Sequence, residues 1–136
     1  MSDVAFDRTA VLPPGLRIAL RLEGAALFAA ATFVFAWSGW SWLLYFGLFL
    51  VPDLSMLAYL AGRRLGALAY NTLHSTVGPL LLACLGALAP QEPWLAIAAI
   101  WLAHIGLDRM FGYGLKSLKG FGYTHLGPIG RRKDGA

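Results

Sequence analysis

Residues 40–74 decide the fold, and they read WSWLLYFGLFLVPDLSMLAYLAGRRLGALAYNTLH. A helix of about 20 apolar residues is long enough to cross a bilayer. One such run ends at Ala61, and a second begins directly after Arg64. A connection this short makes two consecutive helices an antiparallel hairpin. This stretch therefore predicts two membrane-spanning helices joined by a basic turn.

The composition of the whole chain excludes a water-soluble protein. Of its 136 residues, 58% are hydrophobic and 13% are charged, whereas average soluble domains are about 45–50% apolar and about 25% charged. So few charges cannot cover a surface that faces water. A soluble enzyme, a nucleic-acid-binding domain and a disordered tail are therefore excluded, and an integral membrane protein of one domain remains.

The chain contains four apolar stretches of the required length. We expect them to form an all-α, integral membrane four-helix bundle of antiparallel hairpins over residues 16–114, with helices at 16–37, 40–61, 65–89 and 94–114. Residues 1–15 form an N-terminal tail, and residues 115–136 form a glycine-rich basic tail. The expected partner is then the lipid bilayer, and no nucleic acid is expected to bind.

All 11 lysine and arginine residues lie on one side of this arrangement. They precede or open the first helix, form the turn between the second and third, or end the fourth helix and follow it. The connections on the other side carry only one charged residue, Glu92. Because basic residues favour the cytoplasmic side of a membrane, we expect a multi-pass protein of a bacterial inner membrane with both termini in the cytoplasm.

Several polar side chains are predicted to share one depth in the membrane. Residues equidistant from the turn of an antiparallel hairpin lie level with each other, so Asp53 lies level with His74, and His74 with Asp108. Glu23 falls in the same layer, and His104 lies one turn beyond it. Because an ionised side chain in the hydrocarbon core costs roughly 2.5–3.5 kcal/mol, these groups should face each other inside the bundle.

The spacing along each helix supports this layer. His104 and Asp108 are four residues apart and share one helix face. Asn71 and His74 are three residues apart and share another, with Asn71 about one turn closer to the cytoplasm. Pro52 is expected to kink the second helix beside the layer and to free a backbone carbonyl.

The layer predicts a site for a divalent transition metal. Carboxylate oxygens and imidazole nitrogens are ligands suited to Zn, Mn, Fe or Ni, and such an ion lowers the pKa of a bound water for hydrolysis. The expected ligands are Asp53, His74, His104 and Asp108, with Glu23 as a fifth ligand or general base. The reaction best suited to this site is hydrolysis of a lipid-like substrate that enters from the cytoplasmic leaflet.

Other interpretations of the layer stay open. Arg21 or Arg109 can pair with its carboxylates, so that the layer fixes helix packing and register, or Arg109 can extend to the membrane interface. The layer can also form a proton or ion path. In these cases the protein is a non-enzymatic bundle that conducts ions or binds another membrane protein or a second copy of itself. Haem ligation by His74 and His104 is least favoured, because the two are offset by about a turn.

The tail after the fourth helix contains too many glycines for a helix. It also contains aromatic residues, which are unusual in an ordinary solvated linker. One interpretation is a segment that folds back under the bundle, where His125 would support the site at its cytoplasmic mouth. The interpretation that we favour is an interfacial tail anchored by its lysines, with His125 exposed.

Six short segments resemble a known family. They are RLEG at 21–24, PDLSMLAYLAG at 52–62, YNTLH at 70–74, AHIGLDR at 103–109, GYGLK at 112–116 and THLG at 124–127. The chain is similar, from about residue 17 to about residue 130, to short bacterial integral membrane proteins classed as a domain of unknown function. The resemblance implies a compact helical membrane protein, and it implies no activity and no catalytic residues.

Overall fold

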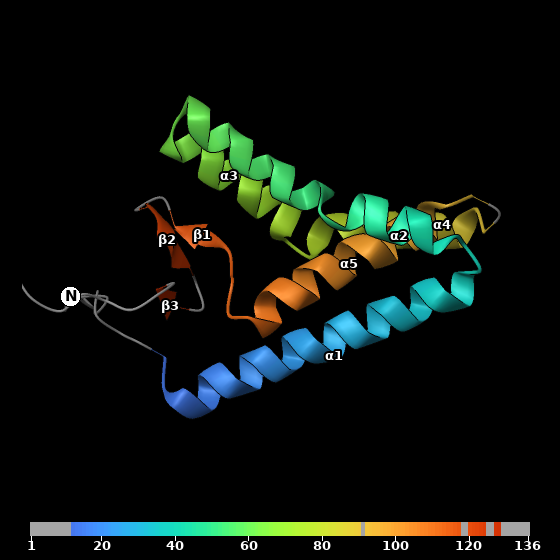
Figure 1. Ribbon diagram of the computed structural model, residues 1–136, viewed down its shortest axis with the longest axis horizontal. Coiled ribbons are helices and arrows are strands. Elements are labelled where there is room, and N and C mark those ends of the chain that lie inside the picture. The colour runs from blue at the N-terminus through green and yellow to red at the C-terminus, as the bar shows by residue number, and fades with distance from the viewer. Residues whose placement is uncertain (1–11, 91, 118–119, 125–126, 129–136) are drawn as a thin grey trace, which may run out of the picture.

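The structure is a computed structural model that describes residues 12–90, 92–117, 120–124 and 127–128. Its helices are α1 (Pro14–Ser38), α2 (Trp42–Phe49), the 3₁₀ helix η1 (Val51–Ala61), α3 (Arg63–His74), α4 (Val77–Leu88) and α5 (Trp94–Met110). Its strands are β1 (Lys116–Ser117), β2 (Gly120–Thr124) and β3 (Gly127–Pro128). Figure 1 shows the helices stacked side by side, with the small sheet at one end.

Within the residues that the structure describes, the prediction of apolar helical stretches of membrane-spanning length is confirmed for three of the four. Three stretches are long and apolar enough to cross a membrane: Pro14–Ser38, Trp42–Ala61 and Arg63–Leu88. The fourth, α5, has 17 residues, which reach about 26 Å at about 1.5 Å per residue. It was expected to continue to residue 114 but ends at Met110, because Gly112 takes a positive φ of 88° that a helix cannot contain.

The second span changes helix type beside Pro52, where the sequence predicted a kink. The α-helical hydrogen bonds end with α2, and the chain continues as the 3₁₀ helix η1. Proline has no N–H to donate, and the N–H of Asp53 bonds to the carbonyl of Leu50 at 3.1 Å. The carbonyl of Phe49 is therefore left without a partner within this span, which is the free carbonyl that the sequence predicted.

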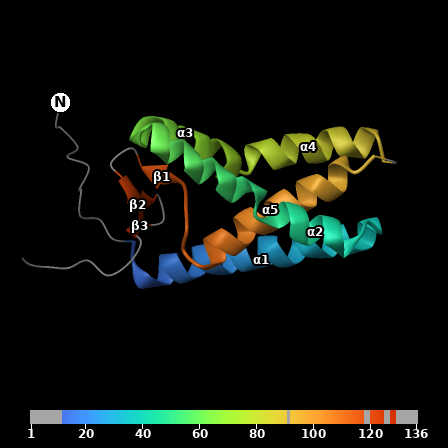
Figure 2. The same cartoon turned by 45° about the horizontal axis from the view of Figure 1, so that its top comes forward.

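The third span is also broken, whereas we expected one helix over 65–89. Ser75 is extended, with φ −80° and ψ 142°, between the end of α3 and the start of α4. Pro79 explains the break, because its missing N–H would have bonded to the carbonyl of Ser75 and its ring clashes with that carbonyl. Figure 2 shows α3 and α4 meeting end to end at this point.

The helices form two pairs, α1 with α5 and η1 with α3, and α2 and α4 also pack on α5. The first pair approaches closely because of two glycines. A Cβ on Gly24 would lie 2.5 Å from the backbone nitrogen of Met110, and one on Gly106 would lie 2.5 Å from that of Phe28. The buried core lies along these helices and includes Phe35, Tyr45 and Ile100. Many large apolar side chains face outward instead, as expected for contact with lipid.

The turns alternate between the two ends of the molecule. The start of α1, the turn between η1 and α3, and the small sheet lie at one end, and the other two helix turns lie at the opposite end (Figures 1 and 2). We call the first of these the tail end. The sheet is antiparallel with strand order β1-β2-β3. It was not predicted, because its strands are only two to five residues long.

Candidate metal centre

Four ionisable side chains meet where the second and third spans are broken. Asp53 lies in the first turn of η1, and His74 is the last residue of α3. His104 and Asp108 project from consecutive turns of α5. One ligand atom from each of the four residues lies within 4.8 Å of all the others. We call these four residues the His/Asp cluster.

The cluster is compact around the two imidazole Nε2 atoms, which lie 3.1 Å apart. Oδ1 of Asp53 lies 3.4 Å from Nε2 of His74 and 3.3 Å from Nε2 of His104. Oδ2 of Asp108 lies 3.3 Å from each of these two nitrogens. Each Nε2 therefore faces three polar atoms at nearly equal distances.

Hydrogen bonding does not account for this arrangement. An imidazole Nε2 carries either one hydrogen or one lone pair, so it makes one well-aligned hydrogen bond rather than three. A cation between the four atoms would interact with a lone pair from each of them at once. The donor set and its geometry therefore fit a metal ion.

The ring of His74 is oriented by its own helix. Its Nδ1 lies 2.9 Å from the carbonyl oxygen of Tyr70, so Nδ1–H donates to this oxygen and the lone pair of a neutral Nε2 faces the cluster. The Tyr70 ring also stacks on the His74 ring, with 3.7 Å between the centroids. Metal-binding histidines usually donate their second ring N–H to such an acceptor, and His74 has one.

The ring of His104 is enclosed by the end of α2. The Phe49 ring packs against it edge-on, at 5.4 Å between centroids. Its Nδ1 is buried and makes no hydrogen bond in the described part of the chain, although the backbone of Phe49 lies beside it. The carbonyl freed by Pro52 is thus close to a cluster nitrogen that needs an acceptor.

The two sides of the cluster differ in burial. The side chains of His74 and His104 are 4% and 2% exposed, whereas those of Asp53 and Asp108 are 32% and 20% exposed. The carboxylate edge is therefore open to the surroundings, while the imidazole edge is closed. A molecule that reaches the cluster would approach it from the carboxylates.

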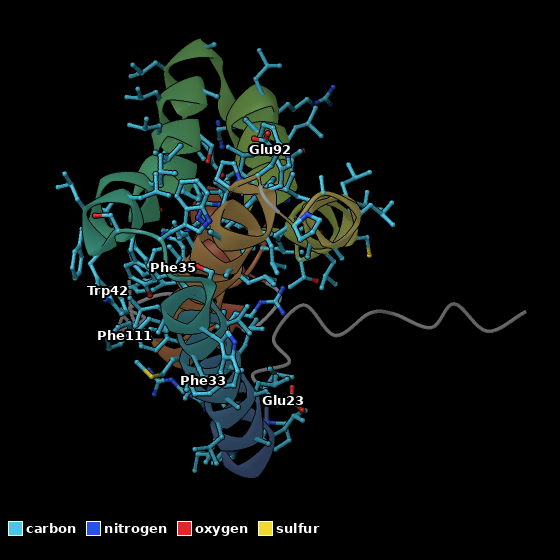
Figure 3. All side chains as sticks on the ribbon, turned by 90° about the vertical axis from the view of Figure 1, so that its right-hand side faces the viewer. Glu23, Phe33, Phe35, Trp42, Glu92 and Phe111 are labelled. Carbon is cyan, nitrogen blue, oxygen red and sulfur yellow. The ribbon has the colours of Figure 1, made fainter. Side chains whose placement is uncertain are left out.

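Glu23 does not join the cluster, so its prediction as a fifth ligand or general base is corrected. Its side chain is exposed and points away from the other helices (Figure 3). The cause is rotation about the axis of α1. Gly24 faces α5, and each residue turns a helix by about 100°, so Glu23 points elsewhere.

Arg21 and Arg109 lie near the cluster, but neither forms the predicted ion pair with one of its carboxylates. Within the part of the chain that the structure describes, the ion pairs of the cluster include neither Arg21 nor Arg109. Arg21 donates instead to the carbonyl of Phe111 at 2.9 Å, just past the end of α5, where a cation is favourable. The backbone and Cβ of Arg109 pack against Gly24. The alternative in which arginines neutralise the layer is therefore not found.

Asn71 fastens the chain that follows α5 onto α3. Its side-chain amide donates to the carbonyl of Lys116 at 2.8 Å and accepts from the N–H of Lys116 at 2.6 Å. A narrow crevice at this end is lined by His74, Asp108 and residues 113–115, among others. The beginning of the tail, up to Lys116, therefore packs on the bundle, as in the interpretation that the sequence analysis did not favour. His125 lies outside the described residues.

Two residues beside the cluster were missed by the sequence analysis, Tyr70 and Lys116. The Lys116 ammonium lies 5.0 Å from the centre of the Tyr70 ring, and Lys116 is 5% exposed. Burial lowers the pKa of Lys116, and the negative charge of Asp108 opposes this shift. The spacing of four between Tyr70 and His74 was a usable signal, whereas no spacing points to Lys116.

The fold and the cluster define a class of protein, a helical protein with apolar stretches of membrane-spanning length, whose breaks bring two histidines and two aspartates together. The chain belongs to the family described as domain of unknown function DUF4260, which matches residues 17–129. The matched range includes the whole cluster, Asn71 and Lys116. No curated protein and no solved structure matches the chain. The resemblance to a family of unknown function is thereby confirmed.

Proposed function

We propose that this protein binds one divalent transition metal ion within the membrane through Asp53, His74, His104 and Asp108. The observation that carries the proposal is the convergence of four ligand atoms, with five distances between 3.1 and 3.4 Å. Ligands at about 2.0–2.1 Å from a tetrahedral zinc ion lie about 3.3–3.4 Å from one another. The distances therefore suit Zn²⁺, and the same donor types also suit Mn²⁺, Fe²⁺ and Ni²⁺.

Charge balance supports the same proposal. Two carboxylates bring two negative charges, and a divalent ion cancels them. A buried charge in a medium of low dielectric constant is costly unless it is paired. A neutral metal site therefore explains how two aspartates are kept close together in an apolar bundle.

The arrangement in the membrane follows from the basic residues. The start of α1, the turn with Arg63 and Arg64, and the chain after α5 share the tail end. We propose that this end lies in the cytoplasm, by the positive-inside rule, with α5 as the fourth span. A bacterial inner membrane is the membrane that this topology suits.

The use proposed for the metal is hydrolysis of a lipid-like substrate. A metal ion lowers the pKa of a bound water and so supplies hydroxide at neutral pH. The partial exposure of Asp53 and Asp108 supports access of water and substrate to the ion. Glu23 has no part in this chemistry, because it points away from the cluster.

The competing proposal is a non-enzymatic bundle, in which protonated histidines form an ion-paired layer with the aspartates. One observation favours it, since both helix breaks lie at the cluster, and broken helices beside ionisable groups are common where ions cross membranes. This alternative predicts a folded protein that holds no transition metal. Metal analysis therefore separates the two.

The first test measures the metal content of the full chain, purified in detergent and supplied with zinc. We expect about one equivalent of zinc per chain, a strong loss in Asp108→Asn, and no loss in Glu23→Gln. Glu23 is a matched control because it is an acid predicted at the same depth but is exposed on α1. Less than about a tenth of an equivalent of any of Zn, Mn, Fe or Ni would contradict a metal site.

A further inference from the structure

The segment that follows α5 is built into the wall of the cluster. We call residues 112–116 the strap. It begins at a turn made possible by the positive φ of Gly112, just after the carbonyl of Phe111 that Arg21 holds. It ends at Lys116, whose backbone N–H and carbonyl are both bonded to Asn71. Both ends of the strap are therefore fixed to helices, one to α1 and the other to α3.

The strap closes the tail end of the cluster. Tyr113, Gly114 and Leu115 line the same narrow crevice as His74 and Asp108. Gly114 is buried, although it lies outside the helices. The strap is therefore in contact with the space beside the proposed ligands, and the residue at its end is brought close to them.

That residue is Lys116, and its side chain packs against Tyr70, whose ring stacks on one of the proposed ligands. It is 5% exposed, and its ammonium lies over the ring of Tyr70, which stacks on His74. The negative charge of Asp108 acts on this ammonium. Asn71 thus fixes the backbone of a residue whose ammonium lies over the ring that stacks on His74 and is influenced by the charge of Asp108.

The charges of the site then favour an anion. Two aspartates and a divalent ion sum to zero, and the Lys116 ammonium adds positive charge near them. In a buried site this field is strong, because little water screens it. A phosphate group pairs well with both a metal ion and a lysine ammonium.

We propose that the ligand which reaches the metal carries a phosphate group, with one oxygen toward the ion and another toward Lys116. Asn71 acts as the positioning residue that holds Lys116 there. This inference rests on the proposed metal site and specifies its ligand. The phosphate can belong to a phospholipid headgroup or to free phosphate, since the recognition chemistry is shared.

The test is calorimetric binding of inorganic phosphate, and of a short-chain phosphatidic acid, to the zinc-loaded full chain in detergent. We expect binding that is at least about tenfold weaker without zinc and at least about tenfold weaker in Lys116→Met, as for the loss of one charged hydrogen bond. Lys116→Arg should retain most of the affinity. Zinc content should stay the same in both variants.

Asn71 is tested with two variants and a control. Asn71→Ala should weaken phosphate binding, and Asn71→Asp should lie between, because a carboxylate still accepts from the Lys116 N–H but does not donate to its carbonyl. Thr72→Val is the matched control, since Thr72 is exposed on the same helix and bonds only locally, to the carbonyl of Leu68. It should leave the affinity unchanged.

The outcomes separate this inference from the proposed function. A chain that binds no zinc overturns the metal site itself. A chain that binds zinc, but binds phosphate equally with and without it or equally in Lys116→Met, overturns only the anion site. Binding of the lipid alone identifies a headgroup, and equal binding of inorganic phosphate identifies the free anion. Both of these results support the inference.

Discussion

The two histidines of the cluster show how single residues prepare a site. Nδ1 of His74 donates to Tyr70, so its lone pair already faces the place where a metal would bind. Nδ1 of His104 makes no hydrogen bond in the described part of the chain, although the backbone of Phe49 lies beside this ring. We infer that the ring of His74 is already oriented for metal binding. A bound metal would fix the orientation of the His104 ring more than that of the His74 ring.

The burial of Lys116 predicts that the stability of the protein depends on pH. Burial lowers its pKa from 10.5 in spite of Asp108, so the folded state binds this proton less tightly than the unfolded state. The free energy of unfolding therefore rises as the pH increases through the lowered pKa of Lys116. This rise is complete once the pH passes 10.5, the ordinary pKa of a lysine. Lys116→Met removes this dependence while it keeps an apolar stem.

We therefore expect Lys116→Met to be more stable than the parent chain near neutral pH, with the difference shrinking as the pH approaches 10.5. Thermal unfolding in detergent between neutral and alkaline pH measures this. Arg64→Met, at an exposed turn position, is the control and should change little with pH. A constant difference across the whole range would contradict the prediction.

Predictions for single residues were right where the depth of a residue along its helix decided its position. They were wrong where the rotation of the helix about its axis decided it. Asp53, His74, His104 and Asp108 were brought together as expected, because their depth follows from the rise per residue and the turn positions. Whether they bind a metal stays a prediction. Glu23 was placed wrongly, because the packing partner decides which face of α1 is buried, and Gly24 is the residue that lets α5 approach.

At the scale of the helices, the breaks locate the cluster. A continuous second span would place Asp53 within an α-helix, whereas here it lies at the start of η1, where an acidic group is favourable. His74 lies at the end of α3 because Pro79 prevents the chain from remaining α-helical beyond Ser75. The effect of Pro52 was predicted, and that of Pro79 was overlooked although it has the same physical cause.

The contact between α1 and α5 predicts a pair of opposite effects. Gly24→Ala places a Cβ 2.5 Å from the Met110 nitrogen and 2.8 Å from Cβ of Arg109, so we expect a loss of about 1–3 kcal/mol of stability. Gly15→Ala, on the same helix, meets nothing within 4 Å and should be neutral or stabilising by up to about 1 kcal/mol. Thermal unfolding in detergent compares the two. Equal effects would show that the close contact does not matter.

At the scale of the whole molecule, the helix pairs converge at the cluster. The pair of α1 with α5 supplies His104 and Asp108, and the pair of η1 with α3 supplies Asp53 and His74. The strap joins the two pairs at the tail end through Arg21 and Asn71. A metal ion would join them a second time, so metal binding should stabilise the fold as a whole.

The placement of both termini is a prediction at this scale. Reporter fusions test it, with a fluorescent protein that folds in the cytoplasm and an alkaline phosphatase that is active outside it. Both termini should give fluorescence and no phosphatase activity, because the basic residues gather at the tail end. A phosphatase fused in the Trp94 turn should be active. Phosphatase activity at either terminus would contradict the topology.

The sequence by itself determined the apolar and helical character of the chain and the common depth of Asp53, His74 and Asp108. These properties depend on local quantities, namely apolar length, turn position and rise per residue. Only the tertiary structure decided which helix faces meet, that Glu23 points away, and that Asn71 carries Lys116 to the cluster. Those features depend on contacts between residues far apart in the chain, such as the pair 45 positions apart that fastens the strap, and no local pattern encodes them.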